Sequence, residues 1–223
     1  MPTVNQVVQS AMQELSLVAG LSTQQYATPR LRKFVEDAFF LMFDDEDHYW
    51  NRFIERVDLA VANGLLTENV VGALGIIITD YRDILAVWPD GSSKQLVDLG
   101  FLTNASTLTG STARYKAPSN TVSGRPFRIY PTGFTGTVQA LVRSRLPQPF
   151  DDAQELYLDK TALAKGTAFM YLASTGTNAG HAASLQAQFV SRVNQVKLQE
   201  NTVTIAKDPR LSYDSTDEWF EMP

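Results

Sequence analysis

Cysteine is absent from the 223 residues, so the chain has no disulfide and no thiolate ligand for a metal. Histidine is scarce, with only His48 and His181, which leaves few candidates for a general base or an imidazole ligand. No apolar run approaches the ~20 residues of a membrane-spanning helix. The first residues lack the basic and apolar regions of a signal peptide. The lack of cysteine fits a reducing compartment, and we expect neither secretion by a signal peptide nor a membrane partner.

Motifs that mark common catalytic sites are also absent. The sequence has no G-x-S-x-G nucleophile turn, no phosphate-binding G-x-x-x-x-G-K-[ST] and no dinucleotide-binding G-x-G-x-x-G. Asp44 and His48 would share one face of a helix, but an acidic run of this kind is usually exposed surface. We therefore expect no catalytic residue, no cofactor and no metal. A small soluble enzyme without a recognisable motif stays open as an alternative.

The apolar content is sufficient for a sizeable core, because 44% of the residues are hydrophobic and 19% are charged. A first helix is expected from Thr3, which forms a capping box with Gln6, to Gly20. A second helix begins at Thr28, with Pro29 in its first turn. Apolar residues from Trp50 to Val61 then predict a third helix that ends near Asn63-Gly64.

After Leu66 the pattern changes to short apolar runs and turns. Strands are predicted over 73–79, 84–88, 95–99, 127–130 and 137–143, and Pro89-Asp90-Gly91 predicts a turn. Residues 103–124 are rich in Ser, Thr, Gly and Asn, which is typical of a long loop or a poorly ordered excursion. This stretch of the chain therefore predicts a small, mostly antiparallel β unit.

Helix is expected again after Pro149. Asp159 is a suitable N-cap for one helix, and apolar residues spaced four, four and three from Leu185 to Val196 predict another. Such short helices cannot bury their apolar faces alone, so the N- and C-terminal helices are expected to pack together. The predicted fold is α+β, a helical bundle with a β insertion and an extended C-terminal arm. Its parts are N-terminal helices (1–66), a β-rich insertion (67–150), C-terminal helices (151–197) and the arm (198–223).

Charges are segregated along the chain. Eight acids lie between Glu36 and Asp58, whereas the stretch 105–150 has six cations and no acid. Solvated surface explains such runs in many proteins, but unlike charges also suit contacts between neighbouring copies. The arm combines acids with aromatic residues, which are favoured anchors in interfaces. The candidate interface residues are Arg125, Arg128, Arg143, Arg145, Asp44, Asp45, Asp47, Tyr213, Trp219 and Phe220.

Several stretches between residues 70 and 197 resemble a known family. They are GALGIII at 72–78, YRDILAVW at 81–88, GRPFRIYP at 124–131, RSRLPQPF at 143–150 and LYLD at 156–159. Two helices separated by a Gly-Thr-Asn-Ala-Gly break follow them. In this order they resemble the head-to-tail adaptor, or connector, proteins of tailed bacteriophages, especially the tail tubular protein A type of short-tailed phages.

This resemblance implies a structural virion protein at the head-tail junction, made in the bacterial cytoplasm. Such adaptors form a homo-oligomeric ring, often twelve-fold, beneath the portal protein. The ring extends the channel for double-stranded viral DNA without sequence-specific contact and presents a docking surface for a tail or nozzle protein. Another tail-completion or tail-terminator protein of the virion stays open as an alternative.

Overall fold

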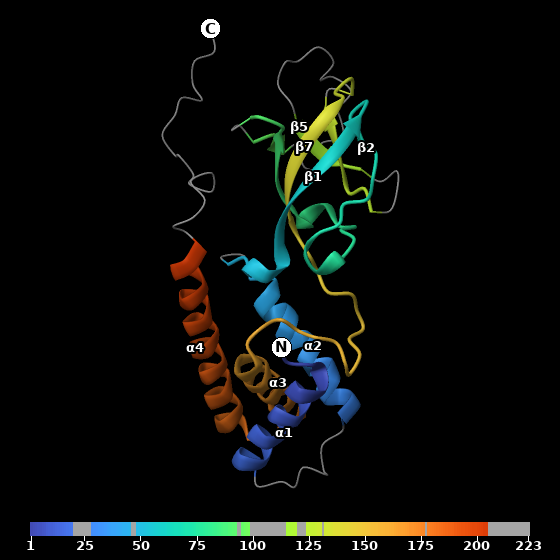
Figure 1. Ribbon diagram of the computed structural model, residues 1–223. Helices are drawn as coiled ribbons and strands as arrows, with labels where there is room; N and C mark the ends of the chain where they lie inside the picture. The colour runs from blue at the N-terminus through green and yellow to red at the C-terminus, as the bar shows by residue number, and fades with distance from the viewer. Residues whose placement is uncertain are drawn as a thin grey trace. The chain divides into compact units, whose positions relative to one another are not determined.

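The computed structural model describes residues 1–19, 28–45, 48–92, 95–98, 115–119, 124–130, 132–176 and 178–204 (Figure 1). The chain divides into two compact units. The first consists of Met1–His48 and Gln148–Pro223, and the second of Tyr49–Pro147. The described helices of more than one turn lie in the first unit and the strands in the second, so the fold is α+β. No helix among the described residues is long and apolar enough to cross a membrane.

The first unit contains the helices α1 (Val4–Ala19), α2 (Thr28–Phe43), α3 (Lys160–Thr175) and α4 (Ala179–Thr204). Helix α3 lies at their centre, because it packs against each of the other three. Its buried residues are mostly small, and a Cβ atom added at Gly166 would lie 3.0 Å from the Phe189 ring and 3.1 Å from Ala38. These small side chains let α2 and α4 approach α3 closely.

The helix ends follow the expected local signals. The backbone N–H of Gln6 donates to the Thr3 hydroxyl at 3.4 Å, and the N–H of Thr3 donates to the Gln6 side chain at 3.2 Å. This reciprocal pair confirms the predicted capping box. Asp159 caps α3 by accepting from the Ala162 N–H at 2.8 Å, and Gly176 ends it in the left-handed conformation.

In the second unit, the described strands form one sheet in the order β3-β7-β1-β2-β6-β5-β4. The strands are β1 (Ile54–Ala62), β2 (Leu65–Leu66), β3 (Ile84–Pro89), β4 (Val97–Asp98), β5 (Tyr115–Pro118), β6 (Phe127–Tyr130) and β7 (Gly136–Arg143). Only the β4–β5 pairing is parallel among these. The predicted strands over 84–88, 127–130 and 137–143 are therefore confirmed. The buried side chains of β1, β3, β6 and β7 form the main core of this unit.

The helix predicted from Trp50 to Gly64 is wrong. Its residues form the 3-10 helix η2 (Asn51–Phe53) and then β1, which pairs with β7 from Ile54 opposite Arg143 to Val61 opposite Gly136. Val57, Leu59 and Val61 point to one face in a strand, so the apolar positions fit a period of two as well as a helical one. The β-branched residues and the long partner strand decide in favour of strand.

Three further expectations need correction. Residues 73–79, predicted as a strand, contain the 3-10 helix η3 (Ala73–Gly75). The predicted loop over 103–124 contains β5, to which β4 pairs in parallel. The strand predicted over 95–99 is confirmed in part, because Val97–Asp98 form β4 among the described residues there. Residues 198–204, expected to begin the arm, continue α4. The rest of that arm lies outside the described residues.

We predict that Asp159→Ala lowers the unfolding free energy by about 1–2 kcal/mol, because it removes a helix cap and the pair with Arg192. Asp159→Asn should lose less stability, because asparagine still caps the helix.

The contribution of Asp159 also depends on pH. Burial disfavours the Asp159 carboxylate, but hydrogen bonds from Arg192 and the Ala162 N–H outweigh it and lower the pKa. Its stabilisation is therefore present above the unfolded-state pKa of about 3.9 and is lost as pH falls through the lower folded-state value. Chemical denaturation of the unchanged protein and both variants from pH 3 to pH 7 measures these contributions. Equal losses of unfolding free energy in both variants would contradict the capping role.

Candidate interaction surfaces

Two of the predicted interface arginines converge on one buried carboxylate. Arg143 lies at the end of β7 and donates to Asp83 Oδ1 through Nε at 3.1 Å and Nη2 at 3.0 Å. Arg145 Nε lies 3.6 Å from Asp83 Oδ2. Asp83 is positioned by the 3-10 helix η4 (Tyr81–Asp83), whose N-cap is Asp80. The sequence predicted both arginines but not their acidic partner.

The pKa values of two neighbouring carboxylates in this cluster are shifted in opposite directions. Burial raises the pKa of Asp83 above its usual range, although Arg145 and Arg143 oppose that shift. The neighbouring Asp80 has a lowered pKa, because Arg82 donates to its carboxylate from both the side chain and the backbone. Much of the positive charge of Arg143 is therefore matched within the unit rather than offered to a partner.

The other two predicted arginines make local contacts of different kinds. Arg125 Nη2 donates to the Thr67 carbonyl at 2.8 Å, while its buried Nε has no hydrogen-bond partner. The guanidinium of Arg128 lies 4.4 Å from the centre of the Tyr130 ring, a cation-π geometry. The four arginines therefore make three kinds of local contact: to a carboxylate, to a backbone carbonyl and to an aromatic ring.

A buried lysine in the second unit was not predicted as a notable residue. Lys116 on β5 is 2% exposed, donates from Nζ to the Ile84 carbonyl at 2.9 Å and lies 3.0 Å from Asp98. The Tyr81 hydroxyl also donates to Asp98, and burial, followed by this bond, raises the tyrosine's pKa. These contacts join Asp98 of β4 to Lys116 of β5 and to the Tyr81 side chain.

The predicted acidic surface is partly used inside the first unit. Asp45 forms an ion pair with Lys197 of α4, and His48 Nε2 lies 3.2 Å from Glu200 Oε2. Helix α2 ends at Phe43, so Asp44 and His48 do not share the helical face that was considered for a metal. The described side chains contain no cluster of three or more potential metal ligands. Asp47 lies outside the described residues.

Residues 71–77 of the second unit form a short turn, the hairpin tip, that carries three exposed apolar side chains. Val71 bridges Ile77, and the Gly72 N–H donates to the Ile76 carbonyl at 2.9 Å. Val71, Leu74 and Ile77 are all exposed, with Leu74 at 44%. Three exposed large aliphatic side chains within seven residues make the hairpin tip a candidate contact surface.

The backbone of the hairpin tip is strained at Leu74. This residue has φ 64° and ψ 14°, a left-handed conformation that a leucine adopts at a cost of about 1–2 kcal/mol. Gly72 anchors the tip, because a Cβ there would lie 2.5 Å from Ser144 Oγ and 3.0 Å from Val142. Strain that persists at an exposed apolar residue is typical of functional positions.

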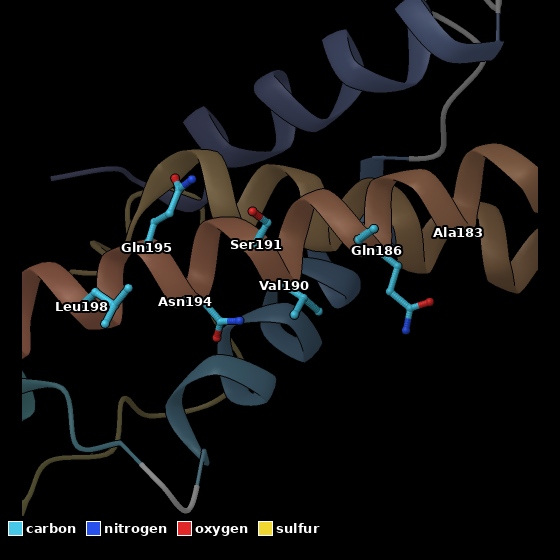
Figure 2. A pocket seen from close by; sticks show the side chains of 8 residues that line it. Ala183, Gln186, Val190, Ser191, Asn194, Gln195 and Leu198 are labelled. Atoms are coloured by element: carbon cyan, nitrogen blue, oxygen red, sulfur yellow. The ribbon is translucent and has the colours of Figure 1, made fainter.

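A second surface, the outer face of α4, lies on the first unit. A shallow, open groove of about 690 Å³ lies along this face and is lined by α4 alone, and Figure 2 shows its side chains along the helix. The face consists of Ala183, Gln186, Ala187, Val190, Ser191, Asn194, Gln195 and Leu198. The sequence predicted only the buried apolar face of α4, which contains Leu185, Phe189 and Val193. The missed signal was the absence of charge at this helical spacing.

The predicted arm residues Tyr213, Trp219 and Phe220 lie outside the described residues. No known protein family matches the sequence, and no curated protein matches it significantly. The candidate surfaces therefore depend on the geometry of this chain alone.

We predict that Asp83→Ala lowers the unfolding free energy by about 3 kcal/mol, because it leaves the largely buried Arg143 without its carboxylate. Arg82→Ala is the control, since this well-exposed arginine pairs with Asp80 at the surface and should contribute less than about 1 kcal/mol. Chemical denaturation measures both. Similar small losses in the two variants would show that the Asp83 cluster does not stabilise the unit.

Proposed function

We propose that the protein is a head-to-tail adaptor of a tailed bacteriophage. Copies of the chain would form a ring, twelve-fold on the virion, that docks beneath the portal protein and presents a surface to a tail or nozzle protein. The viral double-stranded DNA would pass through the ring without sequence-specific contact. The protein is made in the bacterial cytoplasm, acts at the head-tail junction and performs no bond chemistry.

The hairpin tip carries the assembly role. Leu74 leaves 44% of its surface in solvent, and its left-handed backbone lowers stability. A docking partner that buries the tip would gain about 25 cal/mol for each Å² of apolar surface removed from water. The order of stretches between residues 70 and 197 supplies the resemblance to phage adaptors, and the tip supplies an independent reason for a protein partner.

We expect apolar side chains, rather than salt bridges, to make the main contacts with the partner. Asp45 and Arg143 already have oppositely charged partners in their own units, so a salt bridge to a neighbour would compete with existing pairs. We interpret the four helices as a bundle that would form the body of the ring subunit. The tip would provide a separate attachment point on the second unit.

Mixing the purified chain with the portal ring of its phage tests the proposal. We expect a complex with a ring of added density on one face of the portal, observed by electron microscopy, and a corresponding rise in mass by light scattering. A chain that never binds the portal ring would contradict the adaptor role. Binding to isolated tail tubes instead would favour a tail-terminator protein.

Leu74→Asn separates the role of the tip from its effect on folding. Asparagine tolerates the left-handed conformation, so the unfolding free energy should rise by up to about 1 kcal/mol while binding to the portal ring weakens. Leu41→Asn, at an exposed leucine of α2, should not raise stability. Unchanged binding by the Leu74 variant would remove the tip from the interface.

A further inference from the structure

The outer face of α4 is uncharged over its whole length, although α4 itself carries charges. Arg192 pairs with Asp159 at 2.8 Å, Lys197 pairs with Asp45, and Glu200 lies 3.2 Å from His48. All three side chains therefore have partners in the first unit, and Arg192 also reaches the edge of the outer face, where its Nη1 donates to Gln195 Oε1 at 3.4 Å. What remains on the outer face is apolar side chains and neutral amides or hydroxyls.

These side chains suit an extended peptide segment. Val190 and Leu198 are 48% and 69% exposed, and with Ala183 and Ala187 they provide an apolar strip. Gln186, Asn194 and Gln195 lie along the same groove and offer both donors and acceptors, as Figure 2 shows for their side chains. An extended chain needs an apolar strip for its apolar side chains and also donors and acceptors for its backbone N–H and C=O groups.

The chain itself supplies a segment with matching chemistry. Residues 205–223 follow directly after α4, and they contain Leu211, Tyr213, Trp219, Phe220 and Met222. Pro209 cannot continue a helix within its interior, so the chain is suited to change direction there. The acids of this segment would meet no like charge on the outer face of α4.

The segment is long enough to cover the groove. From Ala183 to Leu198 the groove extends about 22 Å at 1.5 Å per residue of helix. Residues 205–223 can span about 60 Å when extended at about 3.3 Å per residue. A turn near Pro209 therefore leaves enough chain for residues 211–222 to run back along α4.

We propose that residues 205–223 of each chain bind to the outer face of α4 of the same chain. Tethering favours this occupant over a second copy, because a segment joined by a short linker has an effective concentration in the millimolar range. The aromatic side chains of the segment would lie on the apolar strip, and the amides would bind its backbone. This proposal does not depend on the adaptor role.

A synthetic peptide of residues 205–223 with a fluorescent label at its amino end tests the proposal. It should bind saturably to the chain truncated after Thr204, which keeps Glu200 beside His48. It should bind the full chain at least tenfold more weakly, because the tethered segment already occupies the groove. Fluorescence anisotropy measures both affinities.

Matched variants locate the site. In the truncated chain, Val190→Lys should weaken peptide binding at least tenfold, whereas Ser184→Lys, an exposed position of α4 outside the groove, should not. Circular dichroism confirms that both variants keep their helix content. A peptide with Trp219→Ala and Phe220→Ala should also bind at least tenfold more weakly.

Three outcomes would overturn the proposal. They are no binding of the peptide to the truncated chain, equal binding to the full chain, and binding that Val190→Lys leaves unchanged. Light scattering identifies the competing occupant: a truncated chain that dimerises through Val190, and is not dissociated by the peptide, would assign the groove to a second copy.

Discussion

Close packing around α3 is the constraint on which the first unit depends. Helices α1 and α2 come from the start of the chain and α3 and α4 from its second half, yet α3 contacts all three others. Gly166 makes this possible, because even a methyl group there would press on Phe189 and Ala38. Residues 49–147, which form the second unit, are therefore an insertion between His48 and Gln148 that leaves the packing of the four helices around α3 intact.

Local signals predicted the parts of the fold that local chemistry decides. The Thr3–Gln6 capping box, the Asp159 cap and strands β3, β6 and β7 were readable because each depends on neighbouring residues. The sequence could not decide β1, whose apolar residues fit helix and strand alike and whose conformation follows from pairing with the distant β7. The strand predicted over 73–79 was wrong because the glycines of the hairpin tip permit a turn, which the hydrophobicity of the segment does not indicate.

Candidate interface residues were harder to predict than the fold. Charge segregation along the sequence identified Arg143 and Asp45, but could not reveal that Asp83 and Lys197 lie against them. Ionic partners depend on three-dimensional proximity, whereas a run of like charges is a property of the linear chain. The outer face of α4 shows the reverse case, since the spacing of its uncharged residues was visible in the sequence but carried no obvious motif.

The discontinuous first unit has a consequence for the order of events during synthesis. Helices α1 and α2 leave the ribosome early, but their main packing partner α3 does not exist until residues 160–175 have been made. The described strands of the second unit lie between residues 54 and 143, so that unit can fold while the first two helices still expose apolar surface. A growing chain of this protein therefore passes through a stage at which it is open to chaperones and to aggregation.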